Sequence, residues 1–248
     1  MEAIFYNIVG GIIVAALIEA WIRIGNFLSG KKFRNIFGFN LQDPFYISYG
    51  VLQLGAHRIL NDKGEQVEYP FNKPGRREVF GKIPYLVSDA QTRGVSYLAT
   101  SFGKNSNVKP YLVSDIEIAQ KLDVSYCSVG GRNNLKTNSI EEHEENEFFK
   151  FNISAPGSIV GVKDSSLKFT VKEGYDYGFI IKIQPKSLQN RTWVGIAGLG
   201  VWGTSGAAWF LARNWKSIEK IYGTRPFGLI VKVRIGKDES AQMVYNSP

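Results

Sequence analysis

The sequence predicts an α/β protein in which an N-terminal transmembrane helix precedes a domain built on a mixed sheet with an antiparallel section. Three observations carry this prediction. A long apolar run lies within the first 28 residues. Helix and strand patterns alternate after residue 88, which is typical of a parallel layer. Between residues 147 and 184, short strand-like runs are separated only by turn residues, which indicates antiparallel pairing.

The apolar run covers residues 4–28 (IFYNIVGGIIVAALIEAWIRIGNFL), and its centre from Ile8 to Ile18 has no charged or polar side chain. As a helix it would be about 37 Å long, which exceeds a hydrocarbon core of about 30 Å. Its only charges, Glu19 and Arg23, are spaced to pair on one helix face. The alternatives are a buried helix of a soluble core and a signal peptide, although no basic segment precedes the run.

The charges that flank this run predict its orientation. No Lys or Arg precedes it, whereas Lys31, Lys32 and Arg34 follow it. Because positive residues stay on the cytoplasmic side, we expect a single-pass membrane protein with its N-terminus outside and its C-terminal domain in the cytoplasm. The lipid bilayer is then a partner of residues 4–28. Small residues spaced four apart within the run also predict a homo-oligomer formed through this helix; they are Gly11, Ala15, Ala16 and Ala20.

These features divide the chain into a transmembrane helix (1–28), a basic juxtamembrane tether (29–44) and a cytoplasmic α/β domain (45–248). With 44% apolar and 13% aromatic residues, the chain can bury a full core. The chain has a net charge of +8, and its basic residues just after the apolar run are explained by anionic lipid. No basic cluster interleaved with aromatic residues lies elsewhere, so nucleic acid is not an expected partner.

The composition argues against several classes of site. One cysteine, Cys127, excludes an intrachain disulfide and fits a reducing compartment. One cysteine and two histidines without ligand spacing predict no metal site. A P-loop and a G-x-S-x-G elbow are both missing. The sequence therefore identifies no catalytic residue, and whether the protein is an enzyme stays open.

The elements of the domain follow in order. Residues 45–60 begin as a strand, and the polar, Gly- and Pro-rich residues 61–83 predict a loop or hairpin. Capping boxes at Ser88/Gln91 and Ser114/Glu117 predict helices. The expected alternation is helix 89–102, strand 108–113, helix 115–122 and strand 124–129.

An acidic stretch at 138–147 is expected to be a solvated helix or loop. The antiparallel section then contains the predicted strands 147–153, 157–163, 167–172 and 176–184. The chain returns to α/β order with strand 192–197, helix 204–222, strand 227–235 and a last strand at 241–245.

A glycine turn follows strand 192–197 and contains G-x-G-x-x-G at Gly198, Gly200 and Gly203. Because an apolar helix pattern follows, the turn resembles the Rossmann dinucleotide fingerprint and makes the domain Rossmann-like over about 12 residues. The resemblance implies a phosphate at the helix N-terminus, with the hydroxyls of Thr204 and Ser205 as further donors. The acidic residue expected about 20 positions later is missing. Close packing of helix on strand explains the glycines equally well.

A second glycine turn follows strand 124–129 and contains Gly130, Gly131, Arg132 and Asn133. Arg132 can pair with a phosphate or carboxylate, and Asn133 and the following Asn134 can hydrogen-bond a base or sugar. In an open α/β sheet, ligands bind beyond the carboxyl ends of the parallel strands. The two turns would therefore share one crevice if their strands were parallel neighbours. An ordinary Gly-Asn turn is the alternative.

These residues favour a membrane-anchored domain that binds a small anionic ligand, expected to be a nucleotide or a nucleotide-derived molecule, in sensing or regulation. One alternative is an enzyme, such as a hydrolase or glycosidase, acting on a nucleotide-like substrate. The other is a membrane-tethered interaction module without a ligand, in which the glycines only pack.

Overall fold

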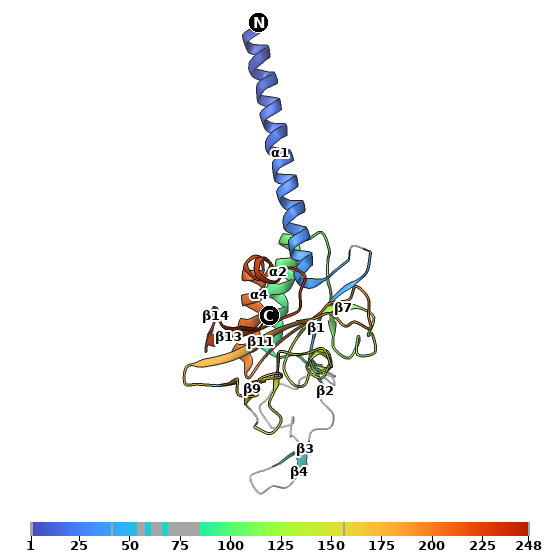
Figure 1. Cartoon of the computed structure of the whole chain (residues 1–248), viewed down its shortest axis with the longest axis vertical. Helices are drawn as coiled ribbons and strands as arrows, with labels where there is room; N and C mark the ends of the chain where they lie inside the picture. Colours follow the sequence, from blue (N-terminus) through green and yellow to red (C-terminus); the bar gives the residue numbers. More distant parts are fainter. Residues whose placement is uncertain are drawn as a thin grey trace, which may run out of the picture.

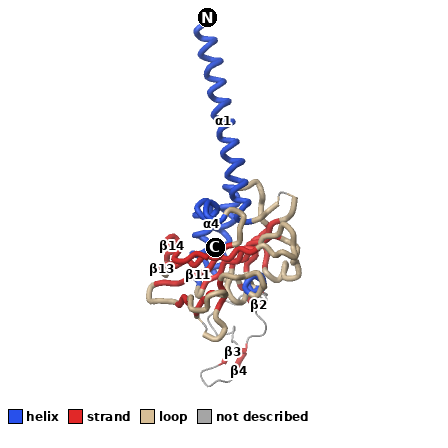
Figure 2. The backbone as a smooth tube through the Cα atoms, in the orientation of Figure 1, coloured by secondary structure: helices blue, strands red, loops and turns tan. Residues whose placement is uncertain are grey.

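A computed structural model describes residues 2–40, 42–53, 58–60, 66–68, 85–155 and 157–247. It contains a seven-stranded mixed sheet with helices on one face and a short helix and a smaller sheet on the other (Figures 1 and 2). The predicted mixed-sheet α/β fold is therefore confirmed. Most of the loop predicted at 61–83 lies outside the described residues.

The helices are α1 (Glu2–Phe37), α2 (Asp89–Asn105), α3 (Leu135–Glu141) and α4 (Val201–Tyr222). The main sheet has the order β14 (Lys237–Ser247), β13 (Phe227–Arg234), β11 (Tyr175–Ile183), β12 (Trp193–Gly198), β7 (Ser125–Val129), β1 (Phe45–Tyr49) and β6 (Tyr111–Ser114). A three-stranded sheet contains β10 (Lys168–Thr170), β9 (Ser158–Gly161) and β8 (Phe149–Phe151). Two short pairs join β2 (Leu52–Gln53) to β5 (Tyr85–Leu86), and β3 (Arg58–Leu60) to β4 (Gln66–Glu68).

The main sheet has a parallel half and an antiparallel half. β12, β7, β1 and β6 are parallel neighbours. β11 runs antiparallel to both β12 and β13, and β14 runs antiparallel to β13. The predicted antiparallel section is thus divided, because β8, β9 and β10 form their own sheet whereas β11 joins the main one.

The helical face of the sheet holds the larger core. α4 and α2 lie side by side on it. Ala207 and Leu211 of α4 belong, with Leu229 of β13, to one continuous apolar cluster on this face. On the opposite face, Ile140 of α3 and Phe149 of β8 belong to a second cluster that covers β11 and β12. Both faces are therefore covered, which is why the central strands are apolar on both sides.

The segment predicted as a basic tether is helical up to Phe37 and forms the last turns of α1. Phe33, Ile36 and Phe37 are buried in the core, whereas Lys31 and Lys32 are exposed. The spacing of the buried residues places them on one helix face, so this part of α1 is amphipathic and docks on the domain. Gly38 ends the helix at a φ of +64°, and its N–H donates to Arg34 O at 2.7 Å.

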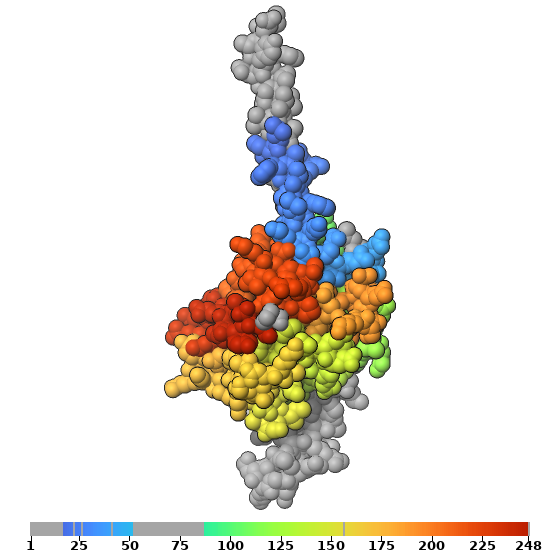
Figure 3. Space-filling model, in the orientation of Figure 1, coloured from blue at the N-terminus to red at the C-terminus, as the bar shows by residue number. Residues whose placement is uncertain are grey.

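The rest of α1 projects away from the domain (Figure 1), and the blue part of this helix stands clear of the domain in Figure 3. Among the helical residues that the structure describes, no stretch is long and apolar enough to cross a membrane. The transmembrane helix expected over residues 4–28 is therefore not supported by this structure and stays a prediction.

The two predicted capping boxes have different outcomes. Ser88 and Gln91 form both hydrogen bonds of a capping box and begin α2, as predicted. Ser114 and Glu117 form the same pair of bonds, but the helix predicted at 115–122 is wrong, because only turns follow. Ten residues connect β6 to β7, which flank β1 on opposite sides, and this connection leaves little length for a helix.

Candidate functional site

The two glycine turns lie beside each other. β7 and β12 are parallel neighbours, with Val129 paired to Ile196, and both turns follow at the carboxyl ends of these strands. A cavity of about 370 Å³ opens there. Its lining residues are Ser88, Ala90, Gln91, Gly131, Arg132, Phe151, Gly157, Gly198, Leu199, Gly200, Val201 and Thr204.

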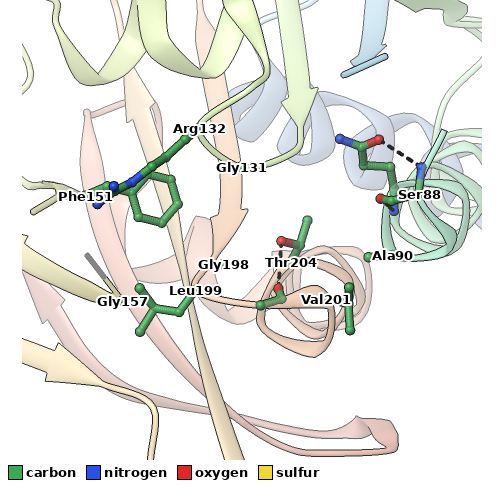
Figure 4. Close-up of a pocket in the computed structure, with 12 residues that line it drawn as sticks. Ser88, Ala90, Gly131, Arg132, Phe151, Gly157, Gly198, Leu199, Val201 and Thr204 are labelled. Carbon is green, nitrogen blue, oxygen red and sulfur yellow. Dashed lines mark hydrogen bonds between the residues drawn. The ribbon is translucent and has the colours of Figure 1, made fainter. Parts of the chain in front are cut away.

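The cavity has two sides that differ in origin. Figure 4 shows Arg132 and Phe151 on one side, and on the other Ser88, which caps α2, and Ala90 in its first turn. Leu199 of the turn after β12 and Val201 at the start of α4 add apolar surface. The cavity therefore combines one guanidinium with apolar walls and a few neutral polar groups, a composition common in small-molecule sites.

The turn after β7 presents its residues in different ways. Gly131 and Arg132 line the cavity, whereas the buried Gly130 and the exposed Asn133 do not. Gly130 has a φ of +153°, and a Cβ there would lie 2.7 Å from Gln91 Nε2. A glycine is therefore required at 130, while Gly131 leaves open space toward the cavity, with its nearest contact at 3.8 Å.

Arg132 lies at the edge of the cavity over an aromatic ring. Its guanidinium carbon is 5.2 Å from the centroid of Phe151, and Nη2 donates to Asn152 O. A guanidinium carries five N–H donors, so most remain for a phosphate or carboxylate. The contact with Phe151 orients this exposed side chain without using those donors.

Two buried residues, Asn134 and Asp115, hold this turn in roles that the sequence did not predict. Asn134 caps α3 by accepting from Lys136 N and Thr137 N, and it also accepts from Ser128 Oγ at 2.9 Å. Asp115 accepts from Leu135 N at 2.8 Å. The ligand contact expected of Asn134 is therefore wrong, because its side chain is buried as a helix cap and does not line the cavity. An asparagine after a glycine turn is a recognisable helix N-cap signal, whereas nothing local marks the contact of Asp115 with this turn.

Glu141 is a second group that the sequence did not single out. One carboxylate oxygen accepts from Phe151 N at 3.0 Å, and the other is buried without a hydrogen-bond partner among the described residues. Burial raises the pKa of Glu141 to about 7, and the positive charge of Arg132 opposes this rise. Glu141 does not line the cavity but supports the strand that carries Phe151.

The turn after β12 departs from the fingerprint that it resembles. The sequence leads us to expect unpaired N–H groups at the N-terminus of α4, but the carboxylate of Asp176 occupies that position. Asp176 accepts from Gly200 N at 3.2 Å and from Gly203 N at 2.7 Å. Burial raises the pKa of Asp176, and these backbone donors oppose the rise. The protein thus supplies its own anion where a dinucleotide phosphate would bind.

The glycines of this turn also allow α4 to lie very close to the sheet. A Cβ on Gly203 would lie 2.3 Å from Tyr177 O, and one on Gly198 would lie 2.2 Å from Thr204 N. A Cβ on Gly200 would meet Asp176 Oδ2 at 2.7 Å. Helix α4 begins at Val201, three residues earlier than predicted, so Gly203 belongs to its first turn. Packing therefore accounts for these glycines.

The two hydroxyls predicted at this site point to different places. Thr204 lines the cavity, and its hydroxyl donates to Gly200 O at 3.1 Å. Ser205 does not line the cavity, and its hydroxyl lies 2.5 Å from Asp238 Oδ1. Asp238 is buried and also accepts from Arg93 and Tyr97, each at 2.9 Å. Ser205 and Asp238 thus tie α4 to α2 and β14.

Of the predicted ligand-binding residues, the cavity brings together Gly131, Arg132, Gly198, Gly200 and Thr204. Within the described part of the chain, no group of three or more His, Cys, Asp or Glu residues could hold a metal ion. Cys127 is buried in β7, and burial raises the pKa of its thiol. No known family, curated protein or solved structure matches this chain.

Proposed function

We propose that this chain is a membrane-anchored domain that binds a small anionic, nucleotide-like ligand in a sensing or regulatory role. The observation that carries the proposal is the shared cavity at the ends of β7 and β12, with Arg132 at its edge. Its volume of about 370 Å³ suits a nucleotide-sized molecule. The anion would pair with Arg132, because Asp176 already takes the donors of α4.

Binding is a better proposal than catalysis for this cavity. The residues that line it include no carboxylate, histidine or cysteine among those described. Its polar groups are the guanidinium of Arg132, neutral side chains and backbone. Such groups recognise a charged ligand, but they offer no general base of suitable pKa.

The membrane anchor is the second part of the proposal. Its support is the apolar sequence of residues 4–28 and the large apolar side chains that α1 exposes beyond the domain. Trp21 is 80% exposed and Phe27 is 73% exposed. We propose a single crossing, with the N-terminus outside, the domain in the cytoplasm and self-association through the small residues of the helix.

Purification of the full-length protein tests both parts. Membrane fractionation should recover the chain only with detergent, and mass spectrometry of the purified protein should find a bound anionic metabolite. A reporter fused to the C-terminus should be active only on the cytoplasmic side. Recovery in the soluble fraction would contradict the anchor, and a preparation that neither carries nor binds nucleotides would contradict the ligand proposal.

A further inference from the structure

A second groove lies between α1 and α4, apart from the cavity at the glycine turns. Its volume is about 410 Å³. One wall is the segment of α1 from Gly25 to Lys32, and the other is the C-terminal half of α4. The side chains that matter for its chemistry are Leu28, Lys32, Trp215, Lys216, Glu219 and Lys220.

The walls of this groove are held together by specific contacts. Asn35 Nδ2 of α1 donates to Glu219 Oε1 of α4 at 2.9 Å. The buried Lys182 of β11 donates to Asn35 O at 2.6 Å and to Thr224 O, just beyond α4, at 2.7 Å. Trp215 at the base of the groove is buried, with its ring 5.0 Å from that of Phe33. The groove is therefore preformed.

The rim of the groove is positively charged. Lys32, Lys216 and Lys220 are all exposed, and none of them forms an ion pair with another described residue. Glu219 is the one carboxylate in the lining, and it already accepts from Asn35. The lining therefore carries a net charge of +2, from three lysines and one glutamate.

The upper end of the groove continues into apolar surface. Leu28, in the lining, is 51% exposed, and Ile24, one turn earlier, is 57% exposed. A Cβ on Gly25 would have no atom within 4 Å, so the groove is open there. Lysines beneath an apolar helix surface match a phospholipid, which presents its phosphate beneath its acyl chains.

We propose that this groove binds the headgroup of an anionic phospholipid, with its phosphate near Lys32, Lys216 and Lys220. The inference rests on the proposed membrane anchor, because only an inserted α1 brings the groove to the level of the headgroups. The basic residues after the apolar run all lie on α1. The proposed lipid site adds two lysines of α4 to the membrane contact. The lipid would thereby join α1 to α4, the helix whose N-terminus borders the ligand cavity.

The test is native mass spectrometry of the full-length protein in detergent, titrated with phosphatidylglycerol or phosphatidylcholine of the same acyl chains. We expect phosphatidylglycerol to bind at least about fivefold more tightly. The double variant K216Q/K220Q should lose about 25-fold in affinity for phosphatidylglycerol, since each lysine near a membrane surface contributes roughly fivefold. Its affinity for phosphatidylcholine should fall much less, because the choline cation offsets the charge of that lipid's phosphate.

K168Q/K172Q is the matched control, because these lysines are also exposed but lie on and beside β10. It should bind like the wild type. Equal binding of both lipids, or full binding by K216Q/K220Q, would overturn the proposal. Displacement of phosphatidylglycerol by an equal concentration of glycerol 3-phosphate would overturn the assignment to a lipid. Recovery of the chain without detergent would instead contradict the anchor itself.

Discussion

The two glycine turns look alike in sequence but differ in what their glycines do. After β12, the glycines bring α4 against the sheet, and Asp176 fills the N-terminus of the helix. After β7, Gly131 faces open space and Arg132 lies at the edge of a cavity. A glycine-rich turn thus indicates close approach of the backbone, but the approaching group can be protein or ligand.

The difference arises from the neighbouring strand. β12 is flanked by the antiparallel strand β11, which brings Asp176 and the carbonyl of Tyr177 to the start of α4. β7 lies between two strands that run parallel to it, β1 and β12. The carboxyl ends of parallel strands border a crevice, and the turn after β7 lies there. The turn inside the parallel half is therefore the one left open for a ligand.

The largest expected difference in stability is between two variants that each add one methyl group, one in the turn after β12 and one in the turn after β7. Gly203→Ala places a Cβ 2.3 Å from Tyr177 O, so we expect it to lower the free energy of unfolding by about 3 kcal/mol. Gly131→Ala meets nothing closer than 3.8 Å and should cost less than about 1 kcal/mol. Denaturant unfolding of the full-length variants measures both. Similar losses would mean that the turns do not differ in packing.

Glu141→Gln tests, through the pH dependence of stability, a buried residue that supports the turn after β7. Burial raises the pKa of Glu141 from 4.5 to about 7, so its contribution to stability is present below pH 4.5 and is lost as the pH rises through about 7. The loss is on the order of 3 kcal/mol. Glutamine cannot titrate, so Glu141→Gln should flatten the decline in stability between these pH values. Unfolding curves with parallel pH profiles for the two proteins would contradict this prediction.

Asp176→Ala tests whether the turn after β12 can bind an anion once the carboxylate at the start of α4 is removed. The variant leaves Gly200 N and Gly203 N without their acceptor, which should cost about 2 kcal/mol. Inorganic phosphate should then raise the melting temperature of the variant more than that of the wild type, because the helix N-terminus would be free to bind an anion. Asp176→Asn keeps an acceptor oxygen and should respond less. An equal response to phosphate in all three proteins would show that Asp176 does not block an anion site.

Much of the fold could be predicted because it depends on local patterns. The capping box at Ser88, the apolar run of β7 and the helical period of α4 each specify one element. The cavity could be predicted only conditionally, since no pattern in the sequence shows that β7 and β12 are neighbours. Strand order is set by long-range packing, which local signals do not encode.

The role of Asp176 could not be predicted for the same reason. It lies 24 residues before Gly200 on another strand, and its position at the start of α4 depends on the pairing of β11 with β12. The amphipathic end of α1 was a different case, because Phe33, Ile36 and Phe37 have helical spacing. The nearby Lys31, Lys32 and Arg34 favour a basic tether in the sequence, although Lys31 and Lys32 are simply the exposed face of the same helix.

Arg132→Ala should have the smallest effect on stability and a clear effect on binding. Arg132 is exposed, and its contacts are a cation–π interaction and one hydrogen bond, so we expect a loss below about 1 kcal/mol in unfolding free energy. Affinity for nucleoside monophosphates should fall by about 1.5–3 kcal/mol, the contribution of a hydrogen bond to a charged group. Calorimetry with each nucleotide and its uncharged nucleoside measures this loss. Arg132→Lys keeps the charge but not the planar donors, so it should retain part of the affinity. If Arg132→Ala binds the nucleotide as tightly as the wild type does, the open turn is not where the anion binds, and the contrast between the two turns is one of packing alone.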